Sequence, residues 1–208
     1  TSHPNDATEE LFQVIARNPK ISRRFHLPLQ SGSDRILKRM KRLHTFQEYR
    51  EKIDRMRELI PGVSITTDII AGFSGETEDD HKRTLKALEE IRYDGAYIYK
   101  YSVRPATPAS KLPDDVPLFI KERWNAELLA VQKRITREIN EQFVGKTLEV
   151  FAEEINPKNP VQVMGRTDAE KKVVFSGQAA SLGGFQKVKL QALRHETFLG
   201  TPADSASG

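Results

Sequence analysis

The residues that could do chemistry gather around a turn in TDIIAGFSGET, residues 67–77. An apolar, β-type run ends there in Gly72 and Gly75, and Thr77 opens an acidic segment typical of a helix start. A strand followed by such a turn lets a ligand approach bare backbone N–H groups at the carboxyl edge of a sheet. The turn therefore indicates either a ligand site or a purely structural strand-to-helix turn, and both interpretations stay open.

A second polar turn, Gln30 to Ser33, follows the short apolar run FHLPL at 25–29. We interpret this run as a buried strand, with a helix beginning near Asp34. Amide and hydroxyl groups at the end of a buried strand can hydrogen-bond a polar ligand. We expect this turn and the one around Gly72 to open onto the same cavity.

Strands and helices are expected to alternate over most of the first 140 residues. A first helix should run to about residue 18, with Asp6 and Glu9 as a capping pair. The later elements are a strand at 25–29, a helix from 34, a helix between the Thr45/Glu48 capping box and Pro61, a strand at 63–71, a helix at 78–92, a strand at 95–102 and, after a proline-rich loop, a helix with an apolar stripe from Ile120 to Ile139. This alternation predicts an α/β fold with three βα units in parallel pairing, belonging to a barrel or an open sheet.

The texture of the sequence changes after residue 144. Short alternating runs at 147–154, 161–166, 172–177 and 186–193 predict a small antiparallel β-barrel of OB-like character as a second domain. Such barrels often bind RNA, and this one could expose three cations: Arg166, Lys171 and Lys172. Eight cations against seven acids from Gly145 onward do not establish binding by themselves.

The whole chain has a net charge of +4, and its positive charge concentrates in the first part. From Arg17 to Arg57 there are 13 Lys and Arg against four acids. The densest part carries Lys38, Arg39, Lys41 and Arg42. A helix this basic suits an RNA backbone, and a solvated helix face is the alternative interpretation.

Composition excludes several classes of site. The chain has no cysteine, so it contains neither disulfides nor a thiolate-ligated metal, and its five histidines show no ligand spacing. We interpret His26 and His81 as polar or packing residues. No run approaches the roughly 20 apolar residues of a membrane span and no leader opens the sequence, so we expect a cytoplasmic protein without membrane contact. Because Thr1 precedes a loop-like His3-Pro4, we expect a part of a longer protein.

Several long motifs resemble one known family. HLPLQSGSDRILKRMKR, SITTDIIAGFSGET and YKYSVRPATPAS are similar to the C-terminal half of MiaB-type tRNA methylthiotransferases, which are radical S-adenosylmethionine (SAM) enzymes. VGKTLEV and NPVQVMGRTDAEKKVVF resemble the TRAM domain that ends those enzymes. The resemblance implies a partial, TIM-like radical SAM barrel over 1–143 and an RNA-binding TRAM barrel over 144–200. We expect the remaining residues, 201–208, to form a disordered tail.

The resemblance also implies an activity, cofactors and partners. The family's enzymes add a 2-methylthio group to N6-isopentenyladenosine beside the tRNA anticodon, using SAM, two 4Fe–4S clusters and an electron donor. The cluster cysteines and the rest of the barrel lie upstream in that family. We therefore expect this chain to need a missing N-terminal half, to bind the anticodon stem-loop of tRNA, and to be inactive by itself.

Residue by residue, the resemblance assigns binding roles but no catalytic residue and no metal ligand. The residues placed near SAM are Gln30, Ser31, Ser33, Asp68, Gly72, Gly75, Glu76, Tyr101 and Arg104. The residues that their positive charge, not the resemblance, places near RNA are Lys38, Arg39, Lys41, Arg42, Arg166, Lys171 and Lys172. Many radical SAM enzymes carry GxIxGxxE in the corresponding strand, whereas here Asp68 replaces its first residue and Glu76 falls one residue late, which leaves their individual roles open.

Other functions remain alternatives. Sister enzymes modify a ribosomal protein or threonylcarbamoyl-adenosine in tRNA. A different class is an RNA-binding module without catalysis, in which the βα part only supports the TRAM barrel. An unrelated TIM-type enzyme that binds phosphate at 72–77 ranks last, because the chain lacks a convincing acid–base pair.

Overall fold

The computed structural model describes residues 4–105 and 107–203. These residues form two compact units. Unit 1 contains the residues up to Pro19 and from Phe25 to Ile135, and unit 2 contains Lys20–Arg24 and the residues from Thr136 onward. The division falls inside a long helix, before the 143/144 domain boundary that the sequence predicts.

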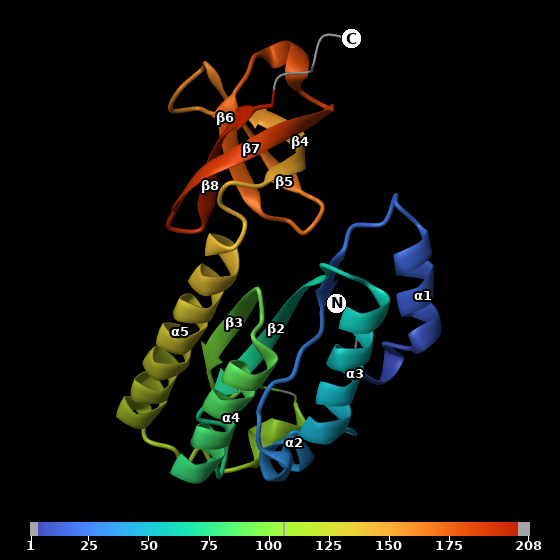
Figure 1. The fold of residues 1–208 in the computed structure, drawn as a ribbon. Helices are drawn as coiled ribbons and strands as arrows, with labels where there is room; N and C mark the ends of the chain where they lie inside the picture. Colours follow the sequence, from blue (N-terminus) through green and yellow to red (C-terminus); the bar gives the residue numbers. More distant parts are fainter. Residues whose placement is uncertain (1–3, 106, 204–208) are drawn as a thin grey trace. The chain divides into compact units, whose positions relative to one another are not determined.

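Unit 1 contains a three-stranded sheet with helices between its strands (Figure 1). Its elements are η1 Pro4–Asp6, α1 Glu9–Arg17, β1 Arg24–His26, α2 Asp34–Arg39, α3 Phe46–Leu59, β2 Ser64–Ala71, α4 Glu78–Ile91, β3 Gly95–Lys100, η2 Pro108–Lys111 and the first part of α5, Leu118–Glu141. The strand order is β1-β2-β3, and β2 and β3 run parallel. The predicted α/β alternation with parallel pairing is confirmed.

Three local predictions in this unit were wrong in detail. Asp6 lies in η1, and the N-cap of α1 is Thr8, whose Oγ1 accepts the N–H of Leu11 at 3.3 Å. The strand predicted at 25–29 ends at His26, because Pro28 has no N–H for the ladder. The chain rejoins the sheet at Gln30, which forms an isolated parallel bridge with Ile69. The strand predicted at 95–102 ends at Lys100.

The capping box that starts α3 is confirmed. Thr45 Oγ1 accepts the N–H of Glu48 at 3.2 Å, and the Glu48 carboxylate accepts the N–H of Thr45 at 2.7 Å. The apolar stripe behind this box, including Tyr49, Ile53 and Met56, is fully buried. Tyr49 also donates its hydroxyl to the carbonyl of Leu27 at 2.6 Å. The box starts α3, and Tyr49 attaches the helix to the segment that follows β1.

The two faces of the sheet differ in polarity. On one face of β2, Ile65, Thr67, Ile69 and Ala71 are all fully buried. Right-handed crossovers place α3 and α4 on the same side of a parallel sheet, so these residues form the core under both helices. The opposite face carries polar and aromatic side chains and stays partly open, as described below.

Unit 2 is a closed five-stranded barrel: the sequence predicts a small barrel and four of its strands, and β8 was missed. Its strands are β4 Thr147–Ile155, β5 Gln162–Thr167, β6 Lys172–Ser176, β7 Phe185–Arg194 and β8 Thr197–Pro202, with η3 Ala179–Ser181 before β7. They close in the order β4-β5-β6-β8-β7. The core consists of inward-facing apolar residues: Val150, Ala152, Val163, Val173, Phe175, Val188, Leu190 and Phe198.

Two details of the barrel correct the prediction. The pairing of β6 with β8 is parallel, so the barrel is not antiparallel throughout. The last strand also includes Thr201 and Pro202, which the sequence analysis placed in a disordered tail. Pro202 is tolerated because it ends the strand, where its missing N–H costs little. The predicted tail from 204 to 208 lies outside the described residues.

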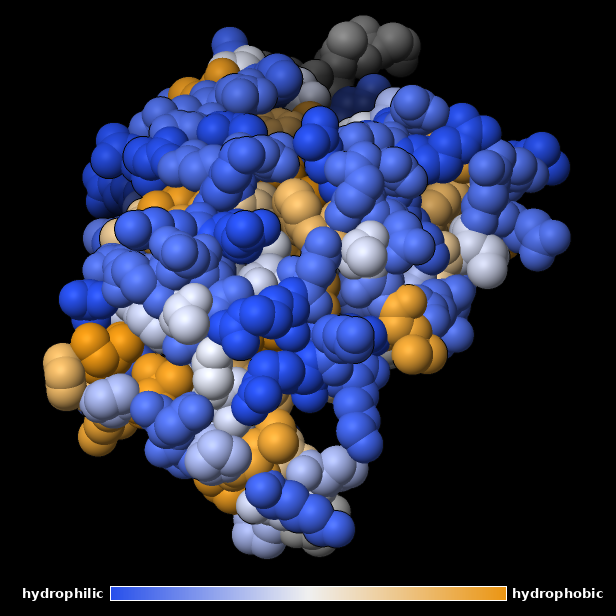
Figure 2. Space-filling view, turned by 90° about the horizontal axis from the view of Figure 1, so that it is seen from below, coloured by the Kyte–Doolittle hydropathy of each residue, from blue (hydrophilic) through white to orange (hydrophobic). Residues whose placement is uncertain are grey.

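No helix in the described part of the chain is both long and apolar enough to span a membrane. The face of the molecule seen in Figure 2 is mainly hydrophilic, and its hydrophobic residues occur in separate groups.

Candidate functional site at the carboxyl edge of the sheet

The turn after β2 is folded around its own carboxylate. Gly72 and Gly75 both have left-handed backbone conformations, with φ of 76° and 71°. Glu76 Oε2 accepts the N–H groups of Gly72 and Phe73 at 2.5 and 2.9 Å. Burial raises the pKa of the Glu76 carboxyl to about 7, although these two N–H donors act in the opposite direction. The N–H groups that sequence reasoning offered to a ligand are therefore engaged inside the turn.

Other side chains cover the two glycines. A Cβ at Gly72 would overlap the Lys121 side chain, and one at Gly75 would lie 3.1 Å from the Arg39 guanidinium. The N–H of Gly75 donates to Asp115 Oδ1 at 2.7 Å. In this structure the glycines thus permit a tight turn and the close approach of protein side chains, which is the structural interpretation left open by the sequence.

The turn between Gln30 and Ser33 attaches β1 to α4. Ser31 Oγ lies 3.4 Å from Thr84 Oγ1, which also accepts the N–H of Gly32 at 3.0 Å. Ser33 donates its hydroxyl to Asp80 at 2.6 Å. The hydroxyls of Ser31 and Ser33, assigned to SAM by resemblance, therefore have partners within the protein.

Asp80 connects the two turns. It accepts hydrogen bonds from the backbone and hydroxyl of Thr77 at 2.9 and 2.6 Å, and it pairs with Arg35. Burial alone would raise the pKa of the Asp80 carboxyl, but hydrogen bonds from Arg35, Ser33 and Thr77 hold it well below its ordinary value. Arg35 also donates to the carbonyl of Gly75 at 2.6 Å, so the two turns lie side by side.

Tyr101 and Arg104 follow β3 and differ in environment. The Tyr101 ring packs edge to face on Phe73, with centroids 4.8 Å apart. Lys121 Nζ lies 5.2 Å from the same ring, donates to the carbonyl of Tyr101 at 3.3 Å and pairs with Asp114. Arg104 is exposed.

Sequence reasoning missed Lys121, which is 3% exposed. A signal was present, because Lys121 precedes Trp124 and Leu128 by three and seven positions and so shares the buried stripe of α5.

The open face of the sheet carries a second polar group. His26 Nδ1 lies 2.9 Å from Thr66 Oγ1, and His26 Nε2 lies 3.3 Å from Asp68 Oδ2. The register places Tyr97 opposite Asp68, and the Tyr97 ring is 5.9 Å from that of His26. Tyr97 and Tyr99 are half exposed, so this face can receive a ligand with a flat, polar surface. Sequence reasoning named Asp68 but passed over His26 and the tyrosines.

The basic cluster of α2 divides into two kinds of residue. Lys38 and Lys41 are exposed. Arg39 donates to the carbonyl and hydroxyl oxygens of Ser74, both at 3.0 Å, and so supports the glycine turn. Burial lowers the pKa of Arg42, and the charge of Asp68 opposes this shift.

The barrel cations also divide. Arg166 pairs with Glu153 and Glu170 at 3.2 and 3.0 Å, and Lys171 is 8% exposed, with Nζ 5.4 Å from the Phe143 ring. Lys172 is exposed on the first residue of β6.

Metal clusters do not fit the residues present. The sequence has no cysteine, and the described residues contain no group of three His, Asp or Glu that could hold a metal ion. The chain therefore offers no ligand set for an iron–sulfur cluster.

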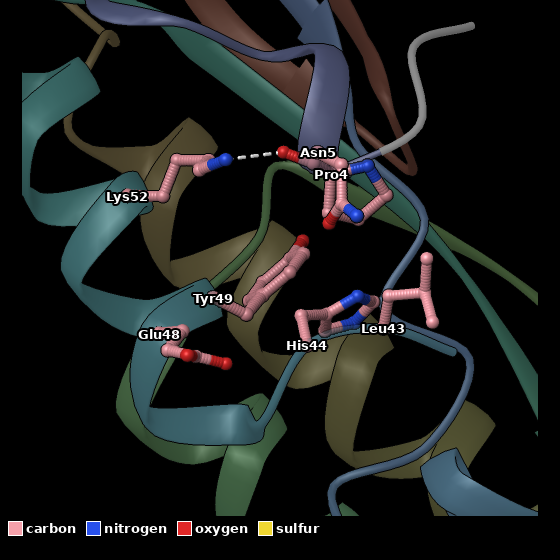
Figure 3. Close-up of a pocket in the computed structure, with 7 residues that line it drawn as sticks. All are labelled: Pro4, Asn5, Leu43, His44, Glu48, Tyr49 and Lys52. Carbon is pink, nitrogen blue, oxygen red and sulfur yellow. Dashed lines mark hydrogen bonds between the residues drawn. The ribbon is translucent and has the colours of Figure 1, made fainter. Parts of the chain in front are cut away.

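A pocket of about 300 Å³ lies elsewhere, at the start of α3 (Figure 3). It is lined by Pro4, Asn5, Leu43, His44, Glu48, Tyr49 and Lys52, none of which is a predicted site residue. Lys52 reaches across it to donate to the carbonyl of Pro4.

Comparison with known proteins identifies the class of protein. The family described as Radical SAM superfamily matches residues 1–88, and the TRAM domain family matches residues 141–201. The chain is also similar in fold to a solved structure: coproporphyrinogen III oxidase (HemN) from Escherichia coli, described as a radical SAM enzyme, aligns over 69% of this chain and 32% of its own, with 19% identity and a TM-score of 0.50. The chain thus combines a radical SAM segment with a TRAM domain.

Curated relatives narrow the class further. A protein of Chlorobium phaeobacteroides is 48% identical over 98% of this chain, one of Chlorobium chlorochromatii is 45% identical over 100%, and one of Dictyoglomus thermophilum is 46% identical over 93%. All three are named tRNA-2-methylthio-N(6)-dimethylallyladenosine synthase, and the chain spans 44–46% of their lengths. The chain belongs to the MiaB-type methylthiotransferase family of radical SAM proteins.

Proposed function

We propose that this chain is part of a radical SAM enzyme that adds a 2-methylthio group to N6-isopentenyladenosine next to the anticodon of tRNA. The observation that carries the proposal is that a radical SAM segment is followed by a TRAM domain in one chain. Relatives named for this reaction match 85–100% of the chain at 43–49% identity, across the radical SAM segment and the TRAM domain alike. In this proposal the barrel of unit 2 contacts tRNA, and the protein acts in the cytoplasm.

The open sheet face is the best candidate within this chain for holding SAM. The adenosine part of SAM is flat and polar, so it suits a surface made of the exposed rings of Tyr97 and Tyr99 and the Asp68–His26 pair. SAM, together with reducing iron–sulfur clusters, supplies the radical chemistry in this superfamily. The chain's own contribution is to bind and orient, while the residues around Gly72, Gly75 and Gln30 fix the shape of the edge.

The remaining predicted site residues keep narrower proposed roles. Arg104 is exposed after β3 and offers a planar guanidinium to a carboxylate or a phosphate. Lys38 and Lys41 are exposed on or just after α2 and can approach RNA. Four further residues support the edge through their protein partners: Ser31, Ser33, Glu76 and Tyr101.

The iron–sulfur clusters need ligands from outside this chain, because it has no cysteine. We therefore expect the purified 208-residue chain to contain no stoichiometric iron or acid-labile sulfide and to be inactive alone. An assay that found one cluster per chain would contradict this expectation.

A ribonucleoside profile of tRNA tests the reaction itself. In a strain in which the gene is deleted, we expect 2-methylthio-N6-isopentenyladenosine to disappear and N6-isopentenyladenosine to accumulate. Loss of the methylthio group from threonylcarbamoyl-adenosine, or from a ribosomal protein, would instead assign one of the sister reactions. An unchanged profile together with an unchanged ribosomal protein would refute the proposal.

A second candidate is an RNA-binding module without catalysis. It is favoured by the engagement of the N–H groups of Gly72, Phe73 and Gly75 by protein carboxylates. SAM titration separates the two functions in the longer protein with its clusters. Asp68→Asn should weaken SAM binding if the sheet face holds SAM, and it should leave SAM binding unchanged if unit 1 only supports the barrel.

A further inference from the structure

Four side chains form one straight row across the outside of the barrel. Phe185 of β7 pairs in register with Phe151 of β4, and Phe151 pairs in register with Arg166 of β5. Arg166 in turn pairs with Lys172 of β6. Because paired residues point to the same side of a sheet, two aromatic rings are followed by two cations.

The two rings of this row face solvent. Phe151 is 38% exposed and Phe185 is 66% exposed, whereas their neighbours Val150 and Ala152 are fully buried in the barrel core. The ring centroids of Phe151 and Phe185 lie 5.2 Å apart, with the planes tilted by 55°. The pair thus forms a small aromatic surface that contributes nothing to the core of the barrel.

Three cations lie near the rings, two of them with acids beside them. On one side, Arg166 is held by Glu153 through Nε and by Glu170 through Nη1, which leaves its Nη2 group directed to neither carboxylate. Lys172 is exposed beyond it. Along β7, the next outward position after Phe185 is the exposed Lys187, which pairs in register with the exposed Glu149 of β4. An aromatic surface with exposed cations beside it matches the chemistry of a nucleotide, in which a π-face lies near phosphates.

We propose that the Phe151–Phe185 pair is a stacking platform for an unpaired base of RNA, with Arg166, Lys172 and Lys187 contacting the phosphates beside it. The proposal rests on the function proposed above and defines the kind of RNA that the barrel takes. A base in a duplex is already stacked on its neighbours, so the platform selects a loop or a single strand. The exposed Lys172 at the end of the row favours a partner that carries phosphates over an apolar protein partner.

Binding of two RNA probes by the 208-residue chain tests this proposal. The probes are a fluorescent anticodon stem-loop and a fully paired RNA duplex of equal length. The double variant Phe151→Leu/Phe185→Leu keeps an apolar surface but removes both rings. Loss of stacking should weaken stem-loop binding roughly five-fold to a hundred-fold and leave duplex binding unchanged. Phe185→Trp should retain or strengthen stem-loop binding, because indole stacks at least as well as phenyl.

Two controls make the result specific. Val161→Ala changes another exposed apolar residue of unit 2, at 68% exposure, and should leave binding of both probes unchanged. Lys172→Gln should weaken both probes alike and reduce the salt dependence of binding. If the double variant unfolds, Phe185→Leu alone serves, because this side chain is the more exposed of the pair.

Three outcomes would overturn the proposal. Unchanged stem-loop affinity in the leucine variants would exclude stacking, and an equal loss for both probes would indicate general electrostatic binding. A wild-type dimer that becomes monomeric in the double variant would show that the rings form a protein interface. Since none of these assays involves methylthio transfer, failure here would leave the tRNA profile test unaffected.

Discussion

The buried carboxyl of Glu76 should make the stability of unit 1 depend on pH. Its pKa in the folded protein is about 7, against an ordinary value of 4.5. Between these two values the folded state binds more protons than the unfolded state, so the free energy of unfolding falls as pH rises through this window. A shift of about 2.5 pKa units corresponds to about 3 kcal/mol. The contribution is complete below pH 4.5 and lost above pH 7.

Glu76→Gln isolates this contribution. The amide oxygen of Gln can still accept the N–H groups of Gly72 and Phe73, but it cannot ionise. When the pH is raised from 4.5 to 8, the free energy of unfolding of the variant should rise by about 3 kcal/mol relative to that of the wild type. Urea unfolding followed by the fluorescence of the single tryptophan, Trp124, reports on unit 1, because this side chain is 3% exposed between α4 and α5.

Other groups titrate in or near the same range but cancel in this comparison. Burial lowers the pKa of His81, and Glu127 opposes this shift. The pH dependence is therefore opposite to that of Glu76: the free energy of unfolding falls as pH falls below 6.5, because the unfolded state then binds more protons. The lowered pKa of Asp80 matters only below pH 3.8. Both groups are present in the wild type and the variant. An unfolding free-energy difference between the two proteins that stays constant from pH 4.5 to 8 would refute the reasoning about Glu76.

The other predictions concern the same edge of the sheet. Gly72→Ala should lower the free energy of unfolding by roughly 2 kcal/mol or more, because it adds left-handed strain and overlap with Lys121. Gly62→Ala is the control: its φ is 77° but the space around it is open, so it should cost only about 1 kcal/mol. Equal losses in urea unfolding would contradict the role of Lys121. Lys121→Met keeps the stem but strands Asp114, and should shift the unfolding midpoint less than Gly72→Ala does. Asp80→Asn should lower the free energy of unfolding by roughly 2–4 kcal/mol, because it weakens a buried, charge-assisted network. The matched control is Asp79→Asn at an exposed position, which should change the free energy of unfolding by less than about 1 kcal/mol. Similar unfolding midpoints for the two variants would show that this network is not important for folding.

Local sequence patterns determined most of the elements of both units, although β8 was missed. The Thr45/Glu48 capping box, the strand before Gly72 and the alternating runs after residue 144 each depend on neighbours within a few positions, and the structure bears them out. The resemblance motifs determined the family, because they extend over most of the chain. Where a single residue altered a local rule, as at Pro28, the predicted strand was too long.

Only the tertiary structure decided what the site residues contact. Gly75 meets Asp115 and Arg35, and each of these partners lies 40 residues away in the sequence. Arg39 supports Ser74 across a separation of 35 residues and so is not simply part of a basic surface. Such contacts depend on which strands are neighbours in the sheet, on how the helices cross it, and on which groups burial leaves without water. None of these is encoded in the spacing of residues along one segment. The sequence therefore located the turns, and the packing of distant side chains determined which groups contact them.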